Sequence, residues 1–516
     1  MDGAEPSTSP RSEPGADFLQ LDMAAAPPRG LAGYLAEQLR AAIADGRLPV
    51  GGRVPPGRVL AEELRVSRGV VTEAYQRLIE DGQLAGRGRA GTFVVAAPIP
   101  APRHASPAAQ APSPAPSYAP STDAETGSGR GAEAPTDFAR PPGPEVFDLL
   151  RASPARIDLT PGVPDLAAFP RGAWLRAERR VLAELSPAAF GYGDPCGALP
   201  LRRAVAHWLA RFRGLRVRPD EVVVVTGVAQ ALGLLAAVLL HEGHDAVAVE
   251  DPGSLGVRQH LQYQGLETPG VPVDGAGLRV DALRDTGVRA VALTPAHQFP
   301  TGVVLDGRRR RELVRWADEG DGLIVEDDYD AEHRYDRPPV PALHAMLPER
   351  TCYTGSVSKT LAPALRTGWL LTPPRFREAV TVAKRYADLG NAVLPQLVLA
   401  ELMDSGELER HLRMLRRRHR RRRDAMIAAI REQLPTARLH GAAAGLHLTV
   451  TFEPGFADAD LAAAALERGV KTQPLSWHRQ RPGRPGLVLG YAAATPTDAA
   501  HGVALLGDAW RELCHG

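Results

Sequence analysis

The sequence predicts two domains: a small α+β domain at the N-terminus, followed by a larger α/β domain with a mostly parallel sheet. Its 516 residues are more than one hydrophobic core normally organises. A stretch rich in Pro, Ala and Ser, residues 96–139, separates two segments of globular composition. In the second segment short β-branched runs alternate with helical stretches, a pattern typical of βαβ units.

Composition and charge limit the class of protein. Hydrophobic residues make up 44% of the chain and charged residues 23%, as in soluble globular proteins. The net charge is +1, so any nucleic-acid-binding surface must be local. The cysteines, Cys196, Cys352 and Cys514, show no paired spacing, so we expect neither disulfides nor a metal site. The N-terminus lacks a signal-peptide pattern and the longest apolar run is about half a membrane span. We therefore expect a cytoplasmic chain without membrane association.

The domain boundaries follow from composition. Residues 1–29 are polar and Pro/Ser-rich and are expected to be disordered. Residues 30–95 form the small domain. Residues 96–139 contain too few large apolar residues to offset their chain entropy, so we expect an extended linker. Residues 140–516 form the large domain.

The strands of the large domain are predicted from β-branched runs, which suit strands buried on both faces. These runs are residues 221–225, 246–250, 289–295, 322–326 and 351–356. After about residue 440 the chain predicts a smaller α+β subdomain, with strand candidates at 447–452 and 487–492.

The small domain shows the element order of a winged helix-turn-helix. Apolar residues recur at helical spacing over residues 31–45. Residues 57–64 and 68–80 predict two more helices joined by a turn, and Ser67 is placed to cap the second of them. Residues 83–95, QLAGRGRAGTFVV, predict a hairpin with a basic, glycine-rich tip. The predicted core is Leu60, Leu64, Val66, Val71, Ala74, Tyr75 and Leu78.

A DNA-binding role follows from that geometry. The second helix of this motif enters the major groove with its N-terminal residues on base edges. Arg68 and Thr72 lie one turn apart on one face, and Ser67 with the helix N-terminus suits a backbone phosphate. The alternative is a small helical domain with a solvated hairpin.

The small domain resembles the GntR-type DNA-binding module in its VPPGR segment, its VSR turn and its GRAGTFV wing. Gly69 and Val70 stand where polar residues often follow the VSR arginine, so no operator sequence is carried over. The resemblance implies contacts with double-stranded DNA from Arg58, Ser67, Arg68, Thr72, Arg87, Arg89 and Gly91.

The motif SVSKTLAPALRTGW, residues 356–369, is the strongest signal in the large domain. Lys359 follows a predicted strand within a turn of small and hydroxyl-bearing residues. A lysine that forms a Schiff base must be desolvated so that its amine is neutral. Ser356, Ser358 and Arg366 are residue types that bind a phosphate group.

Two further motifs suggest the rest of a cofactor site. EDDYD, residues 326–330, follows a buried strand at its carboxyl end, where ligands bind in open α/β sheets. A carboxylate there can keep a pyridinium nitrogen protonated. Residues 224–235, VVTGVAQALGLL, predict a strand, a turn and a helix start, and the amides of residues 226–228 would face an anion.

In this order the three motifs resemble the fold-type I aminotransferase domain, and with the small domain the chain is similar to the MocR-type subfamily of GntR regulators. Further matching segments are residues 161–174, 192–202, 294–302 and 411–426. The resemblance implies pyridoxal 5′-phosphate (PLP) as cofactor. It implies that Lys359 forms the Schiff base, that Asp327 pairs with the pyridine nitrogen and that Tyr329 contacts the 3-oxygen. The implied phosphate ligands are Thr226, Gly227, Val228, Ser356, Ser358 and Arg366, with Tyr192 reaching the phosphate of the other subunit in a homodimer.

The chain departs from the aminotransferase pattern at three places. Ser254 occupies the position of an aromatic residue that stacks on the pyridine ring. The asparagine of the NPTG pattern is missing, with His297 or Gln298 as candidate replacements. Val488 stands where aminotransferases often place the arginine that grips a substrate carboxylate. The candidate substitutes for that arginine are Arg479, Arg481 and Arg484. The last two departures argue against efficient transamination, since an amino acid must be held in orientation for proton transfer.

The arginine run of residues 416–423, RRRHRRRR, predicts a solvated helix face, with a nucleic-acid patch or a dimer contact as the alternatives.

Three functions remain open at this stage. The residues favour a regulator in which PLP, or a small amine or amino acid bound through it, shifts the arrangement of a DNA-binding dimer. The second is a true aminotransferase with an accessory DNA-binding domain. The third is a DNA-binding protein whose large domain has lost PLP and only dimerises.

Overall fold

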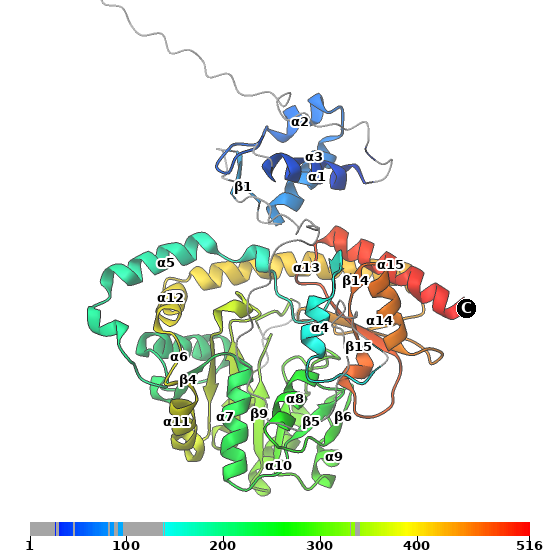
Figure 1. Ribbon diagram of the computed structural model, residues 1–516. Coiled ribbons are helices and arrows are strands. Elements are labelled where there is room, and N and C mark those ends of the chain that lie inside the picture. Colours follow the sequence, from blue (N-terminus) through cyan, green and yellow to red (C-terminus); the bar gives the residue numbers. More distant parts are fainter. Residues whose placement is uncertain are drawn as a thin grey trace, which may run out of the picture. The chain divides into compact units, whose positions relative to one another are not determined.

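The computed structural model of the chain describes residues 26, 30–44, 47–80, 83–86, 91–95, 138, 140–330, 332–335 and 341–515 (Figure 1). The chain divides into two compact units, residues 1–133 and 134–516, each with its own hydrophobic core. None of the helices within the described ranges has the length and apolar character that crossing a bilayer would require.

The first unit contains the predicted winged helix-turn-helix. Its elements are α1 (Leu31–Ala44), α2 (Gly57–Glu63), α3 (Arg68–Glu80) and an antiparallel hairpin of β1 (Leu84–Gly86) and β2 (Thr92–Val94). The Tyr75 hydroxyl donates to the Pro55 carbonyl oxygen at 2.7 Å, which ties α3 to the segment before α2. Of the predicted core, Leu64 and Val66 are only partly buried, and the other five residues are buried.

The second unit is built on an eight-stranded sheet. Its strands are β4 (Val222–Val225), β5 (Ala248–Asp251), β6 (Gly270–Asp274), β7 (Gly277–Leu278), β8 (Ala290–Leu293), β9 (Leu323–Asp327), β10 (Thr351–Ser356) and β11 (Gly368–Leu371). The order is β4-β11-β10-β9-β8-β5-β6-β7, with β10, β9, β8, β5 and β6 parallel to their neighbours in that run and β11 antiparallel to both of its neighbours. Each predicted β-branched run coincides with one of these strands to within two residues at either end.

Helices cover both faces of this sheet, which explains the absence of alternation in the strand sequences. On β4, Val223 and Val225 pack into one core cluster, while Val222 and Val224 pack into another. The helices of this part are α6 (Leu199–Arg213), α7 (Val228–His241), α8 (Leu255–Tyr263), α9 (Val280–Asp285), α10 (Gly307–Glu319), α11 (Pro374–Asp388) and α12 (Val393–Asp404).

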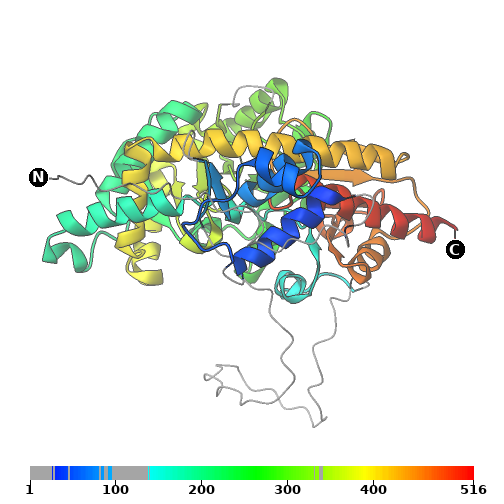
Figure 2. The same cartoon turned by 90° about the horizontal axis from the view of Figure 1, so that it is seen from above.

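The predicted α+β subdomain follows. It contains a sheet of order β12-β13-β16-β15, whose strands are β12 (Arg438–His440), β13 (His447–Thr451), β16 (Gly486–Gly490) and β15 (Gln473–Pro474). Its long helices α13 (Glu407–Gln433) and α15 (Pro496–His515) pack side by side (Figure 2). The segment at the start of the second unit, α4 (Val146–Ala152), β3 (Ile157–Asp158) and α5 (Arg171–Glu184), is tied to this subdomain because β3 pairs in parallel with β14 (Val470–Lys471). The subdomain also contains α14 (Asp458–Glu467).

The prediction that the arginine run of α13 forms a solvated face is wrong for part of the run, which is buried. The side chains of Arg422 and Asp165 are each 2% exposed, and Arg422 Nη1 lies 3.0 Å from Asp165 Oδ2. Arg418 Nε also lies 3.0 Å from that oxygen. Arg422 donates in addition to the Ala492 carbonyl oxygen. These cations therefore hold the segment around Asp165, which precedes α5, against α13.

Asp165→Ala is expected to lower the free energy of unfolding of the second unit by about 3 kcal/mol, because it leaves buried guanidinium groups without their carboxylate. Urea unfolding followed by tryptophan fluorescence measures this unit selectively, since all six tryptophans belong to it. The control is Asp508→Ala, which removes an exposed pair with Arg511 on α15 and should change stability by less than about 1 kcal/mol. Equal effects of the two variants would contradict a structural role for Asp165.

Candidate cofactor and nucleic-acid sites

A cavity of about 700 Å³ lies at the carboxyl ends of the strands, a volume typical of small-molecule sites. Seven of the predicted cofactor residues line it: Val228, Asp327, Tyr329, Ser356, Ser358, Lys359 and Arg366. The strand register explains why they meet. Thr354 pairs with Asp327 across β10 and β9, and Gly368 pairs with both Ser356 and Val225. Segments distant in sequence therefore end at one edge of the sheet.

Lys359 has the environment that an imine-forming lysine needs. Its Nζ donates to the Gly162 carbonyl oxygen at 2.6 Å. Burial lowers the pKa of the Lys359 ammonium, while the charges of Asp327 and Asp330 act in the opposite direction. A lowered pKa increases the fraction of neutral, nucleophilic amine at physiological pH.

The two adjacent aspartates of the EDDYD motif have different roles. Asp328 Oδ2 lies 2.5 Å from Arg213 Nε and accepts the Tyr353 hydroxyl at 2.5 Å, so its charge is neutralised within the core. Asp327 lines the cavity, and within the described residues its carboxylate accepts one long hydrogen bond, of 3.3 Å, from the Thr354 hydroxyl. Burial, followed by the charge of Asp328, raises the pKa of Asp327 to about 7. A cationic ring nitrogen in the cavity would stabilise the ionised carboxylate against the free-energy cost of burial, so Asp327 fits a pyridinium partner.

The turn between β4 and α7 is shaped for an anion. Gly227 caps α7 with φ +87°, and a Cβ there would lie 3.3 Å from the Arg366 guanidinium nitrogens. Arg366 donates to the Thr226 carbonyl oxygen, which fixes the guanidinium beside the helix N-terminus. One predicted donor is engaged elsewhere, because the Thr226 amide donates to Gln230 Oε1 at 2.9 Å. Thr226 and Gly227 lie beside the cavity wall rather than within it.

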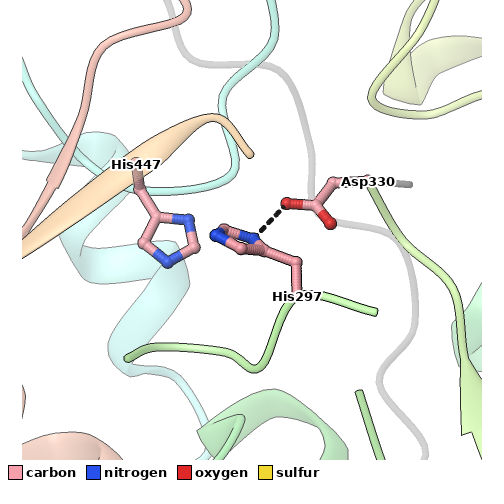
Figure 3. A group of neighbouring side chains, drawn as sticks. All are labelled: His297, Asp330 and His447. Atoms are coloured by element: carbon pink, nitrogen blue, oxygen red, sulfur yellow. Dashed lines mark hydrogen bonds and ion pairs between the residues drawn. The ribbon is translucent and has the colours of Figure 1, made fainter. Parts of the chain in front are cut away.

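A cluster that the sequence did not predict lies against this site (Figure 3). The His297 ring stands between the Asp330 carboxylate and the His447 ring. His297 Nδ1 lies 2.7 Å from Asp330 Oδ2 and 3.1 Å from the Tyr329 hydroxyl, and His447 Nε2 lies 3.0 Å from the Pro300 carbonyl oxygen. Ligand atoms of His297, Asp330 and His447 lie within 4.8 Å of one another, a spacing that also suits a metal ion.

Glycine backbone clamps the His297 ring. A Cβ on Gly445 (φ +85°) would lie 2.1 Å from His297 Cε1, and one on Gly302 (φ +72°) would lie 3.0 Å from Nε2. The ring is therefore held with Nδ1 toward Asp330 and Tyr329. The contact with His297 positions the Tyr329 phenol, which is expected at the cofactor's 3-oxygen. Of the two candidates for the missing asparagine, His297 reaches Tyr329. Gln298 instead closes its own loop, donating to the Pro252 and Phe299 carbonyl oxygens.

In the first unit, four of the predicted DNA-contact residues have exposed side chains. Arg58, Ser67, Arg68 and Thr72 are all exposed, whereas the opposite face of α3 is buried in the core. Ser67 caps α3 by accepting the Val70 amide at 3.4 Å. Gly91 has φ +99°, and a Cβ there would lie 2.7 Å from Arg53 Nε. Arg87 and Arg89 lie outside the described residues.

Comparison with known proteins identifies the family of each unit. Residues 31–94 match the gntR family of bacterial regulatory proteins, and residues 156–484 match aminotransferase class I and II. The probable rhizopine catabolism regulatory protein MocR of Rhizobium meliloti is 32% identical over 488 residues, covering 93% of each chain. The HTH-type pyridoxine biosynthesis transcriptional regulator PdxR of Corynebacterium glutamicum is 32% identical over 472 residues, covering 90% of this chain and 93% of the relative. This chain belongs to the MocR-type regulators.

The MocR-type chain also resembles an enzyme of known structure. The α-aminoadipate aminotransferase LysN of Thermus thermophilus, complexed with N-(5′-phosphopyridoxyl)-L-leucine, is 29% identical with a TM-score of 0.65, covering 71% of this chain and 95% of LysN. The second unit therefore has the class I and II aminotransferase fold, and PLP is its cofactor. The protein is a DNA-binding transcriptional regulator with an aminotransferase-like domain.

The departures of this MocR-type chain from aminotransferases are visible in the cavity. Ser254 lines it, but its hydroxyl caps α8 by accepting the Val257 amide at 3.3 Å, and it has no ring to stack. Val488 is buried in β16. The predicted substitutes for the carboxylate-binding arginine do not line the cavity. Instead, Arg479 donates to the Arg484 carbonyl oxygen, Arg481 donates to Gly270, and Arg484 pairs with Glu453.

Asp327→Asn is expected to stabilise the cofactor-free regulator and to weaken PLP binding. The folded chain keeps the Asp327 proton up to about pH 7, whereas the unfolded chain loses it near the ordinary pKa of 3.8. Stability therefore falls as pH rises between these values, and the variant escapes this loss. In urea unfolding, the gain should be larger at pH 8 than at pH 5 by about 3 kcal/mol.

The matched variant is Asp328→Asn, which unpairs the buried Arg213 and should lower stability at both pH values. A loss of stability in Asp327→Asn at pH 8 would show that this carboxylate has a partner in the folded chain and is not reserved for the cofactor.

Proposed function

We propose that this regulator senses PLP, and a small amine or amino acid bound through PLP, in the cavity of its second unit and transmits that occupancy to DNA binding as a homodimer. The observation that carries the proposal is the desolvated Lys359 at the same sheet edge as the unneutralised Asp327. When bound, PLP supplies an electrophilic carbonyl carbon with which an amine reacts.

The chain's own residues would divide the work of holding the cofactor. Lys359 would attach it covalently, Asp327 would hold a proton at its ring nitrogen, and Tyr329, positioned by His297, would donate to its 3-oxygen. The phosphate would be bound at the start of α7 and by the adjacent turn. The residues proposed for that role are Thr226, Gly227, Val228, Ser356, Ser358 and Arg366.

A homodimer is supported by apolar side chains that face solvent on two neighbouring segments. Phe190 and Tyr192 are 61% and 95% exposed, and Tyr386 and Leu389 are 85% and 58% exposed. The segments adjoin, since a Cβ on Gly390 would lie 3.4 Å from Pro195 Cα. Exposed apolar patches of this kind are typical of subunit interfaces. In such a dimer Tyr192 would reach the partner's phosphate site, and occupancy would shift two subunit arrangements.

Sensing is favoured over amino-group transfer because the cavity lacks two features of a transaminating site. Ser254 provides no aromatic ring against the cofactor, and the buried Val488 provides no guanidinium for a carboxylate. Both features serve to orient a substrate through successive proton transfers, whereas binding alone needs less exact placement.

We further propose that the protein works in the cytoplasm and that its domains are residues 30–95 and 140–516, joined by the linker 96–139 and preceded by the tail 1–29. The three cysteines are free, with Cys196 and Cys352 buried. Free thiols are usual in a reducing compartment.

Lys359→Ala is expected to abolish the absorbance band near roughly 420 nm that lysine-bound PLP gives in general. Borohydride reduction of the wild type followed by peptide mass analysis should place the cofactor on Lys359. The chain has only two other lysines, Lys384 and Lys471, so the assignment is unambiguous. DNA binding should respond to PLP in the wild type and not in the variant. Attachment at another lysine, or no band at saturating PLP, would overturn the proposal.

Arg68→Ala is expected to weaken binding to a duplex selected by the wild-type protein by about tenfold to a hundredfold, since it removes an exposed side chain at the start of α3 that would contact base edges. Fluorescence anisotropy at fixed salt measures the affinity. Arg40→Ala provides the control, because Arg40 lies on α1 and pairs with Glu37. An equal loss in both variants would indicate a general charge effect rather than a recognition role for α3.

A further inference from the structure

A second lysine lines the cofactor cavity. The sequence contains only Lys359, Lys384 and Lys471, and all other basic side chains apart from histidines are arginines. Lys384 pairs with Asp388 on α11, whereas Lys359 and Lys471 both belong to the cavity wall. In a chain that otherwise uses arginine for its cations, two of three lysines therefore face one cavity.

Lys471 is buried but weakly paired. It is 5% exposed. Its Nζ donates to the Arg151 carbonyl oxygen at 3.3 Å and lies 3.8 Å from Asp158 Oδ2, beyond hydrogen-bond distance. Asp158 is directed elsewhere, since its Oδ1 accepts from both the amide and the hydroxyl of Thr160. An ammonium group has three N–H donors, and burying it is costly unless an anion compensates.

The strand register relates Lys471 to the cation that is missing at Val488. Val488 on β16 pairs with Gln473 on β15, and Lys471 lies two residues before Gln473, on β14. Both Lys471 and Gln473 line the cavity. The positive charge that β16 lacks at Val488 is therefore present at Lys471, two residues before the partner of Val488 and in the cavity wall.

The neighbouring groups orient Gln473 as a donor toward a ligand. His478 Nδ1 accepts the Leu255 amide at 3.5 Å, so its Nε2 carries the hydrogen and donates to Gln473 Oε1 at 3.2 Å. Burial lowers the pKa of His478 to about 3, which keeps the ring neutral. With its oxygen engaged, Gln473 presents its amide N–H groups as the remaining polar function.

We propose that Lys471, assisted by Gln473, binds the acidic group of an effector whose amine reacts at the cofactor held by Lys359. This inference rests on the proposed sensing function and specifies its ligand: an amine that also carries a carboxylate or a sulfonate. An ammonium is a compact point charge without the planar fork of arginine, so it accommodates a flat carboxylate and a tetrahedral sulfonate alike. Simple amines lack the group that this subsite binds.

The test titrates the PLP-loaded full-length protein with five probes and follows the cofactor absorbance and the heat of binding. The probes are glycine, 3-aminopropanoate, 4-aminobutanoate, 2-aminoethanesulfonate and propylamine. At least one acidic amine should bind more tightly than propylamine to the wild type. Lys471→Met should weaken that acidic probe by at least about tenfold and leave PLP affinity and propylamine binding unchanged. Comparing the affinities of the three carboxylate probes with that of 2-aminoethanesulfonate shows which acidic group the subsite prefers.

Two further variants separate charge from structure. Lys471→Arg keeps the positive charge and should retain the preference for acidic probes. If Lys471→Met does not fold, the Lys471→Arg variant provides the test, and loss of this preference in a folded Lys471→Arg protein would contradict a charge-based subsite. Arg481→Met removes an exposed cation of the same subdomain that lies outside the cavity and should leave all binding unchanged.

The outcomes are distinguishable. If propylamine binds as tightly as every acidic probe, or if Lys471→Met retains full affinity for them, the anion subsite is overturned while amine sensing stands. If none of the amines perturbs the cofactor in the wild type, amine sensing itself fails, and the subsite fails with it.

Discussion

The second unit depends on one constraint: the hydrogen-bond register of its eight-stranded sheet. The ladder from β4 through β11 and β10 to β9 brings Val225, Ser356 and Asp327 to the same edge of the sheet. Several of the residues proposed to hold the cofactor lie at these strand ends or in the turns that follow them. A slip of one residue in any strand would turn its side chains to the opposite face and dismantle the site. The helices that bury both faces of the sheet fix the register.

The distribution of charge in the core separates structure from function. Asp328 is neutralised by Arg213, and Asp165 by Arg418 and Arg422. These pairs tie distant segments together and need no ligand. Asp327 and Lys471, by contrast, are buried with weaker partners: Asp327 accepts a 3.3 Å hydrogen bond from Thr354, and Lys471 Nζ lies 3.8 Å from Asp158 Oδ2. The free energy spent in burying such groups is recovered only when an oppositely charged ligand enters, which is why they indicate where the ligand's charges belong.

The same fold serves enzymes and this regulator, and the difference lies in a few side chains. The cavity keeps the lysine, the carboxylate and the phenol of a PLP site but lacks the stacking ring at Ser254 and the guanidinium at Val488. An arrangement that binds an amine without holding it for rapid turnover is suited to reporting occupancy. His297, which packs against the backbone of Gly302 and Gly445, lies 3.1 Å from the Tyr329 hydroxyl, in the loop from which the asparagine of the NPTG pattern is missing.

Signals within short stretches of chain were enough to place the elements and the local motifs. β-Branched runs predicted the strands and apolar periodicity predicted the helices of the first unit. The cofactor was implied by the resemblance that the motif around Lys359 carries. Which residues meet across the structure was settled by the fold alone. His297, Asp330 and His447 come from three separate segments, and Lys471 reaches the cavity only because β14 pairs with β3. The arginines of α13 have the sequence pattern of a solvated face, but the fold packs Asp165 against two of them and buries them. Long-range pairing and burial set these contacts, and neither is encoded in the spacing of neighbouring residues.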